Sequence, residues 1–194
     1  MSEIKELEQY AMEHGVPIIQ DEGLELLKQK IIEYDCHSFL EIGTAIGRTA
    51  LVIANLVDPM RVVTIERDPQ MIEQARSHFQ DHANIQLIEG DALEVPLPKG
   101  PFDCIFIDAA KAQYIRFFTK FCPLLSENGI IVSDNMNFHG LVDHPELTHN
   151  RNTKALVRKI RGYREFLMAL SDYETKLYDQ GDGIAITKRK KGKS

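Results

Sequence analysis

Two short elements of the sequence place acidic and amide side chains where a metal ion could bind. Asp108 and Lys111 belong to the element Asp-Ala-Ala-Lys, and Asp134 is followed directly by Asn135; each element ends an apolar run. Carboxylate and amide oxygens are the hard ligands that Mg²⁺ and Mn²⁺ prefer, and a cation relieves the repulsion between neighbouring carboxylates. We therefore predict a divalent metal site, with Mg²⁺ as the favoured ion, formed by Asp108, Asp134 and Asn135. The alternative is that both aspartates cap helices.

Lys111 is the candidate general base of this site. It lies three residues after Asp108, so its amine can reach the same place. An amine that is close to a cation and partly shielded from water gives up its proton more readily than a solvated one. A solvated lysine at the start of a helix is the alternative interpretation of the same residue.

A glycine-rich turn follows the first expected strand. The pattern is Glu41-x-Gly43-x-x-x-Gly47, which differs from a dinucleotide-binding fingerprint by a glutamate in place of the first glycine. A carboxylate there repels a pyrophosphate but suits a ligand that carries an ammonium or sulfonium group. Taken alone, the glycines also fit a simple tight turn.

Acidic residues also end the next two expected strands. Glu66 can accept hydrogen bonds from both hydroxyls of a ribose, and Asp91, within Gly90-Asp91-Ala92, can accept one from an adenine amine. Either acid taken singly fits a solvated strand end. Three acidic or glycine-containing strand ends in succession favour a binding site.

The elements that must position these residues alternate between strand and helix. Strands are predicted over residues 38–42, 62–65, 85–88, 104–107 and 129–133. Helices are predicted over residues 3–13, 21–34, 48–57, 69–79, 113–124 and 153–170. Residues 173–178 and 184–188 flank a glycine-rich turn and predict an antiparallel hairpin. The pattern indicates an α/β fold: a mostly parallel sheet with helices on both faces, which places ligands at the carboxyl ends of the strands.

The order of these strand ends resembles the S-adenosylmethionine-dependent methyltransferases. That resemblance implies a Rossmann-like class I fold with seven strands in the order 3-2-1-4-5-7-6, and S-adenosylmethionine as cofactor. It also implies an N-terminal cofactor contact within residues 16–19. The cofactor-binding residues implied in this way are Val16, Glu41, Gly43, Thr44, Gly47, Thr49, Glu66, Arg67, Asp91, Ala92 and Asp108.

The D-x-x-K and D-N elements resemble those of the metal-dependent O-methyltransferases related to catechol and caffeoyl-CoA O-methyltransferases. Asp108, Lys111, Asp134 and Asn135 match these elements without a gap. The resemblance implies that two vicinal oxygens of the acceptor bind the metal and that Lys111 removes a proton. Relative to the family pattern, Met1 opens what corresponds to the second helix, and the family tends to form homodimers.

A basic segment gives a hint about the acceptor. Residues 151–164 carry six lysines and arginines and no acid, and residues 151–194 have a net charge of +7 while residues 1–150 have −13. A segment whose charged side chains are all positive favours the binding of a polyanion. The alternative is a basic helix face that is simply exposed to solvent. The candidate tRNA-binding residues are Arg151, Lys154, Arg158 and Arg161.

Residues 135–142, together with this basic segment, resemble the bacterial tRNA 5-hydroxyuridine methyltransferases, which form 5-methoxyuridine at the wobble position of the anticodon loop. O5 and O4 of 5-hydroxyuracil are vicinal, as in a catechol, and an unstacked base can enter a pocket. Phe138 is placed to stack on that base or to pack under its own loop. The alternatives are an O-methyltransferase for small catechols and a binding module without catalysis.

Composition restricts the class of protein. The chain has 194 residues, of which 43% are hydrophobic and 27% charged, as in one globular domain. We predict a single methyltransferase domain over residues 1–194, with N-terminal helices in 1–35, the Rossmann-like core in 36–187 and a basic tail in 188–194. Three cysteines without paired spacing exclude a zinc or disulfide scaffold and indicate reduced thiols. Without a secretory signal or an apolar run of roughly 20 residues, the prediction is a cytoplasmic protein that does not bind membranes.

Overall fold

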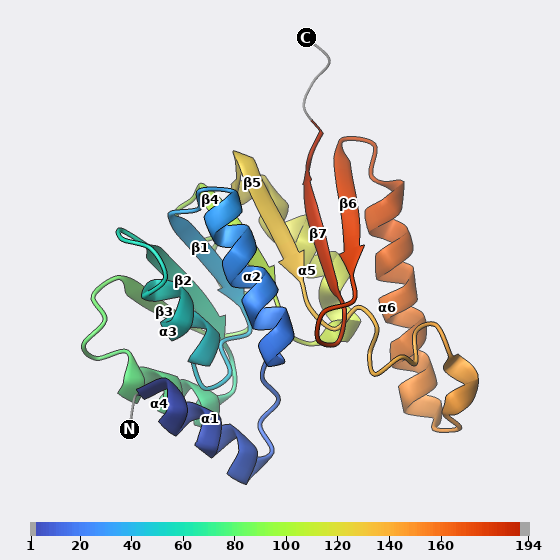
Figure 1. Cartoon of the computed structure of the whole chain (residues 1–194), viewed down its shortest axis with the longest axis horizontal. Coiled ribbons are helices and arrows are strands. Elements are labelled where there is room, and N and C mark those ends of the chain that lie inside the picture. Colours follow the sequence, from blue (N-terminus) through green and yellow to red (C-terminus); the bar gives the residue numbers. More distant parts are fainter. Residues whose placement is uncertain (1–2, 191–194) are drawn as a thin grey trace.

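A seven-stranded sheet lies at the centre of the structure, a computed structural model that describes residues 3–190 (Figure 1). Its strands follow the order β3-β2-β1-β4-β5-β7-β6. The pairs among β1 to β5 are parallel, and β7 is antiparallel to both of its neighbours, β5 and β6. The predicted topology and the closing hairpin are therefore confirmed.

The element bounds agree with the predicted ones to within a few residues. The strands are β1 (Ser38–Ile42), β2 (Arg61–Glu66), β3 (Ile85–Glu89), β4 (Phe102–Ile107), β5 (Leu125–Ser133), β6 (Tyr173–Tyr178) and β7 (Ile184–Arg189). The α-helices are α1 (Glu3–His14), α2 (Asp21–Glu33), α3 (Arg48–Ala54), α4 (Pro69–His78), α5 (Tyr114–Phe121) and α6 (Arg151–Ala169). Three 3₁₀ turns are η1 (Lys111–Gln113), η2 (Cys122–Leu124) and η3 (Pro145–Leu147).

Local chemistry explains where the helices begin and end. Asp68 caps α4 and Asn150 caps α6, each by accepting hydrogen bonds from two backbone N–H groups of the first turn. The cap at Asn150 starts α6 two residues earlier than the prediction. The predicted helix over 113–124 is instead three pieces, because Lys111–Gln113 and the Pro-containing Cys122–Leu124 wind as 3₁₀ turns around a shorter α5.

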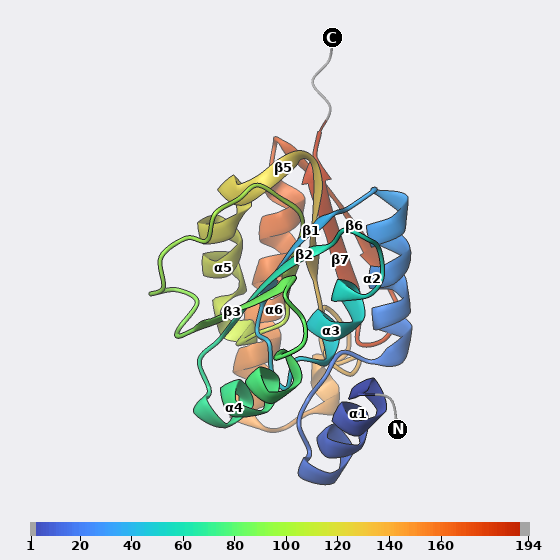
Figure 2. The ribbon, with the colours of Figure 1, turned by 90° about the vertical axis from the view of Figure 1, so that its left-hand side faces the viewer.

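The sheet separates two hydrophobic layers. Figure 2 views the sheet nearly edge-on and shows α2 and α3 on one face and α5 and α6 on the other. Leu27 and Ile31 of α2 are buried against the first face, and Phe118 and Tyr163 pack edge-to-face on the second. Burial on both faces accounts for the continuous apolar character of the central strands.

The carboxyl ends of the parallel strands meet at one edge of the sheet. Ile42 pairs in register with Ile107, and Ile107 pairs with Ser133. The chemically important residues that end or directly follow these strands therefore share that edge: Gly43, Glu66, Asp108 and Asp134.

The end of the chain differs from the prediction. Strand β7 continues to Arg189, so the first two residues of the predicted basic tail belong to the sheet, where Lys188 forms an ion pair of 3.0 Å with Glu174 across the hairpin. Residues 191–194 of that tail lie outside the described residues. Among the described helices, none combines the length and the apolar character needed to cross a bilayer.

Candidate active site

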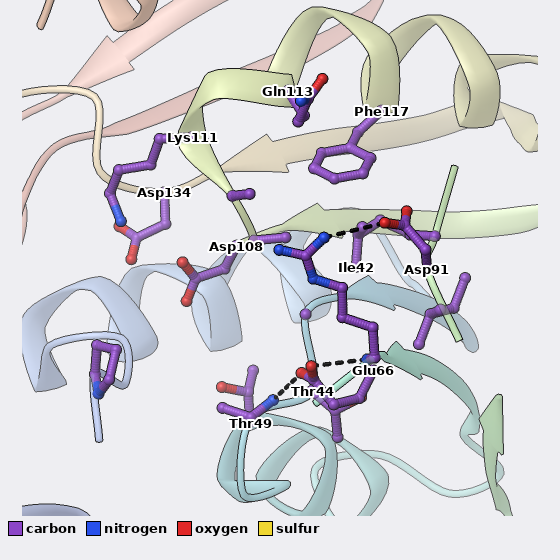
Figure 3. Close-up of a pocket in the computed structure, with 18 of the residues that line it drawn as sticks. Ile42, Thr44, Thr49, Glu66, Asp91, Asp108, Lys111, Gln113, Phe117 and Asp134 are labelled. Carbon is purple, nitrogen blue, oxygen red and sulfur yellow. Dashed lines mark hydrogen bonds and ion pairs between the residues drawn. The ribbon is translucent and has the colours of Figure 1, made fainter. Parts of the chain in front are cut away.

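A cavity of about 410 Å³ opens at the carboxyl edge of the sheet (Figure 3). Its walls come from the turn after β1, the ends of β2, β3, β4 and β5, and the segment between α1 and α2. Most of the predicted site residues line it: Gly43, Thr44, Thr49, Glu66, Arg67, Asp91, Ala92, Asp108, Lys111, Asp134 and Asn135. The structure thus brings the predicted cofactor-binding and metal-binding groups into one space.

The glycine turn has two different functions. Gly43 has a φ of +99° and lies against the backbone of Asp108, so a side chain at position 43 would collide with the Asp108 carbonyl oxygen. Gly47 has a φ of +91°, and a Cβ there would lie 2.7 Å from the ring of Phe79. Within the described residues Gly47 is not part of the cavity wall. The glycine at 47 therefore allows close packing of α3 against α4, and its predicted contact with the cofactor stays a prediction.

Glu66 organises the backbone of two turns. Its Oε2 accepts a hydrogen bond from the Ala45 N–H at 2.9 Å, and its Oε1 accepts from the N–H groups of Arg67 and Asp68 at 2.8 and 2.9 Å. These bonds hold the carboxylate at the cavity wall. Because each carboxylate oxygen has two acceptor sites, Oε2 retains one for a ligand hydroxyl.

Arg67 and Asp91 pair across the cavity (Figure 3). The guanidinium Nη1 of Arg67 lies 3.1 Å from Asp91 Oδ2, and Asp91 Oδ1 accepts the N–H of Leu93 at 2.8 Å. The Leu93 hydrogen bond, followed by the Arg67 interaction, lowers the pKa of Asp91. Asp91 is therefore a hydrogen-bond acceptor at neutral pH.

Two carboxylates share the opposite part of the cavity. The Asn135 amide nitrogen donates to Asp108 Oδ1 at 3.0 Å and to Asp134 Oδ2 at 3.1 Å, so the two acids lie on either side of one amide. Asp134 is 3% exposed. Burial first, and the charge of Asp108 second, raise the pKa of Asp134 to about 8. Burial also raises the pKa of Asp108, and the charge of Lys111 partly opposes that change.

This donor set fits a divalent cation. Two like-charged carboxylates withdrawn from water raise each other's pKa, and a cation between them would remove that cost. The Asn135 amide presents its nitrogen to both acids, and a rotation of the amide group turns its oxygen to the same point. No group of three or more His, Cys, Asp or Glu side chains in residues 3–190 is arranged for a metal. The predicted set contains only two such side chains, because its third ligand is an amide.

Lys111 points into the same part of the cavity. Figure 3 shows its side chain extending toward the carboxylate of Asp134, and its positive charge opposes part of the rise in the pKa of Asp108 and of Asp134. Its Nζ also lies 5.9 Å from the centre of the Phe138 ring. The predicted base and the two predicted acidic metal ligands are therefore together.

Glu41 lies elsewhere than its motif suggested. Its side chain is 1% exposed and accepts a hydrogen bond of 2.6 Å from the hydroxyl of Thr64, which in turn lies 2.6 Å from the hydroxyl of Thr44. Burial raises the pKa of Glu41 well above its ordinary range. Of the described residues that form the cavity wall, Thr44 is one and Glu41 is not. The hydroxyls of Thr64 and Thr44 connect Glu41 to the cavity wall.

The N-terminal wall of the cavity lies within the predicted contact segment, residues 16–19, but does not include Val16. Val16 packs against the hydrophobic layer formed by α2 and α3, and the wall consists of the next three residues, Pro17, Ile18 and Ile19. Arg48, which is 4% exposed, fixes this segment by donating to the Ile19 carbonyl oxygen at 3.0 Å and to the carboxylates of Glu8 and Asp21. Sequence reasoning missed Arg48, because its partners are 27 to 40 residues away in the chain.

Comparison with known proteins gives the family of this fold and site. The family described as O-methyltransferase matches residues 2–190. The chain belongs to the O-methyltransferase family.

Individual O-methyltransferases show how far the similarity extends. A Staphylococcus aureus protein, provisionally assigned as a caffeoyl-CoA O-methyltransferase, has a structure that superposes with a TM-score of 0.92 at 36% identity and covers 98% of this chain and 93% of its own. O-methyltransferase ankF of Aspergillus thermomutatus is 38% identical over 53% of this chain and 47% of its own length. A catechol O-methyltransferase of Niastella koreensis is 32% identical over 67% of this chain and 64% of its own length. The matches with these two curated relatives thus span about half to two thirds of the relatives.

Helix α6 carries basic residues near this cavity. Figure 1 shows its first turns at the edge of the sheet where the parallel strands end, and α6 packs against η1, the turn that begins with Lys111. Arg161 donates to the Val142 carbonyl oxygen, so this predicted tRNA contact also holds the loop before α6. In the part of the chain that the structure describes, four basic side chains of α6 have no ion pair or hydrogen bond: Arg151, Lys154, Arg158 and Lys159.

Proposed function

We propose that the protein is an S-adenosylmethionine-dependent, Mg²⁺-dependent O-methyltransferase that methylates the 5-hydroxyl of 5-hydroxyuridine at the wobble position of tRNA. The observation that carries the proposal is the placement of Asp108, Asp134 and Lys111 at one end of a cavity whose other end is formed by the glycine turn, Glu66 and Asp91. One end suits an acceptor with paired oxygens, and the other suits a nucleoside.

The nucleoside end supplies hydrogen-bond acceptors for the cofactor. Glu66 Oε2 is available for a ribose hydroxyl, and Asp91 remains ionised and can accept from an adenine amine. S-adenosylmethionine bound there supplies a methyl group on a sulfonium centre. Gly43, whose missing side chain lets the turn after β1 lie against the backbone of Asp108, forms part of the wall at this end.

The acidic end orients and deprotonates the acceptor. Asp108, Asp134 and, after rotation of its amide, Asn135 would hold Mg²⁺, which when bound would lower the pKa of an acceptor hydroxyl. Lys111 accepts the hydroxyl proton at Nζ, and Phe138 provides an apolar surface beside that amine. Fixing the acceptor oxygen in line with the methyl group supplies much of the rate.

The basic side chains of α6 support a nucleic-acid acceptor. Arg151, Lys154, Arg158 and Lys159 lie on the helix that packs against η1, and no carboxylate in the described structure neutralises them. Phosphates of an anticodon stem would replace the counterions of these cations. A dimer and a cytoplasmic location, which the resemblance and composition predict, stay predictions.

Nucleoside analysis tests the proposal. Bulk tRNA from a strain that lacks 5-methoxyuridine is incubated with the protein and isotope-labelled S-adenosylmethionine, with Mg²⁺ or with a chelator, and is then digested for mass spectrometry. We expect labelled 5-methoxyuridine only in the presence of Mg²⁺. Failure to form this nucleoside with Mg²⁺, under conditions in which cofactor binding is measured, would overturn the tRNA proposal.

A small catechol is the second candidate acceptor, favoured by the catechol O-methyltransferase of Niastella koreensis among the relatives. The same acidic end would receive its paired oxygens, and the basic residues of α6 would have no role in turnover. Methylation of free catechols at rates that exceed those on tRNA, unaffected by charge reversal on α6, would support this candidate in place of the first.

We predict that Glu41→Gln leaves the affinity for S-adenosylmethionine within about threefold of the wild type, because the carboxyl group faces Thr64 and not the cavity. The raised pKa of Glu41 makes the folded protein hold this proton more tightly than the unfolded chain, so its contribution to stability falls as the pH rises above the unfolded value. Urea unfolding should therefore show that the free energy of unfolding of Glu41→Gln, relative to that of the wild type, is higher at pH 8 than at pH 5. A tenfold loss of cofactor affinity in calorimetry would instead indicate the direct contact that the motif suggested.

We predict that Arg48→Ala weakens the binding of S-adenosylmethionine about tenfold, because it releases Ile19 and the wall around it. The variant also loses its bonds to Glu8 and Asp21 and leaves a small void, which should lower the free energy of unfolding by about 1–3 kcal/mol. Calorimetry and urea unfolding measure the two effects. Arg76→Ala is the control, because its ion pair with Glu89 is exposed and should contribute little.

A further inference from the structure

The hairpin turn between β6 and β7 is hydrogen-bonded to the loop that follows β5. The Met136 N–H donates to the Gly183 carbonyl oxygen at 2.9 Å, and the Asn137 N–H donates to the Asp182 carbonyl oxygen at 2.8 Å. A Cβ at Gly183 would lie 2.5 Å from Asn137 Cγ. The two segments are therefore as close as their backbones allow.

This loop, residues 135–140, has an unusual backbone conformation. Asn135, Phe138 and His139 have φ values of +64°, +44° and +56°, a region that residues other than glycine rarely adopt. Such conformations persist only where surrounding contacts impose them, and they are common at functional sites. The loop therefore needs an external restraint.

Asp182 supplies that restraint with a buried carboxylate. It is 6% exposed, and its Oδ1 accepts the N–H of His139, next to the strained Phe138. Its Oδ2 is also buried and accepts no hydrogen bond from any residue that the structure describes. The His139 ring nitrogen Nδ1 also lies 3.7 Å from Oδ1, so this carboxylate contacts His139 through both its backbone and its side chain.

The loop begins at the acceptor end of the cavity: Asn135 is part of the cavity wall, and Phe138 lies beside Lys111 but is not among the described wall residues. Asn135 joins the two acids, and the Phe138 ring lies 5.9 Å from Lys111 Nζ. The Asp182 carboxylate and carbonyl oxygen bond the N–H groups of His139 and Asn137, so this acid lies directly against the loop. A movement of the loop would displace Phe138 from the base.

We propose that Asp182 is a positioning residue for the acceptor: its carboxylate fixes the 135–140 loop so that Phe138 faces the place where the acceptor binds. This inference rests on the proposed methyltransferase function, with which it shares the acceptor end of the cavity. It adds a residue from the β6–β7 turn, outside the D-x-x-K and D-N elements.

A single tryptophan can report the position of the loop, because the chain contains none. In a Phe138→Trp background, Asp182→Ala should shift the emission to longer wavelength and raise acrylamide quenching about twofold, because release of the His139 N–H frees the loop. Asp179→Ala, an exposed acid of the same turn, is the matched control and should leave both unchanged. This readout needs no turnover, so it stands even where the proposed function fails.

Kinetics then test the positioning itself in the natural Phe138 background. Asp182→Ala should raise the KM for the acceptor about tenfold, with a smaller change in kcat and an unchanged affinity for S-adenosylmethionine. Asp182→Asn, whose amide oxygen still accepts the His139 N–H, should recover most of that loss and also provides a folded variant if the alanine variant fails to fold. An acceptor KM equal to that of Asp179→Ala overturns the inference, whether or not the emission of Trp at position 138 has shifted.

Discussion

Replacing Asp134 by asparagine is expected to reduce methyl transfer by a factor of about 10³ or more, because one of two charged ligands of the metal is lost. The same change should stabilise the protein in the absence of divalent cations. Asp134 is buried beside Asp108, and its pKa in the folded protein is about 8, whereas an aspartate in an unfolded chain titrates near 3.9. Loss of activity with gain of stability is the signature of a carboxylate retained for function.

The raised pKa of Asp134 determines how the free energy of unfolding should change with pH. A folded-state pKa above the unfolded one means that the folded protein binds the proton more tightly, so wild-type stability falls as the pH rises from about 4 to about 8. The stability of Asp134→Asn should not fall in this way. At pH 8 without metal, its free energy of unfolding should exceed that of the wild type by on the order of 1–3 kcal/mol. Urea unfolding at pH 5 and pH 8, with Mg²⁺ or a chelator, measures it. Mg²⁺ should stabilise the wild type only.

Asp81→Asn is the matched control, since it removes an equal charge from an exposed position. It should behave as the wild type in both assays. If Asp134→Asn kept methyl-transfer activity, or if it were destabilised at pH 8 like a variant that loses a needed contact, the metal site on this edge would be wrong.

The fold could be predicted from the sequence because its signals are local. Apolar strands separated by amphipathic helices indicate parallel pairing, and the glycine-containing segment before β7 indicates a hairpin. Register then follows from burial of both sheet faces. Once Ile42, Ile107 and Ser133 are in register, the residues after them must share an edge. The acidic end of the cavity was predictable for that reason.

Side-chain directions were less predictable than strand ends. Glu41 belongs to β1 itself, so its side chain leaves the sheet toward the face where Thr64 of β2 is available to donate to it. The spacing of a motif does not contain that cross-strand partner. The roles of Arg48 and Asp182 could not be predicted for a related reason, since each side chain is hydrogen-bonded to a segment far away in the chain.

The basic helix shows the same limit. Helical spacing accounts for the face of α6 that packs on the core, where Ile160 and Tyr163, three residues apart, are both buried. Spacing could not distinguish the arginines that bind the protein's own loop from those that are free. Arg161 contacts Val142 and Arg164 pairs with Asp143 at 3.1 Å, which leaves the first half of α6 as the candidate surface for RNA.

Reversing two charges on that surface should separate the two candidate acceptors. In the variant Lys154→Glu with Arg158→Glu, two phosphate partners become repulsive, so the KM for tRNA should rise about 10- to 100-fold and its logarithmic salt dependence should fall by about two. Turnover of a free catechol should not change, because neither side chain lines the cavity within the described structure.

The control for this variant must carry the same change in net charge. Lys5→Glu with Lys99→Glu alters two exposed lysines in α1 and in the segment before β4, outside α6, and should leave tRNA methylation close to that of the wild type. Equal losses in both double variants would show only a dependence on overall charge. A selective loss in the α6 variant, together with the reduced salt dependence, would indicate that phosphates contact Lys154 and Arg158, and would favour tRNA over a catechol as the acceptor.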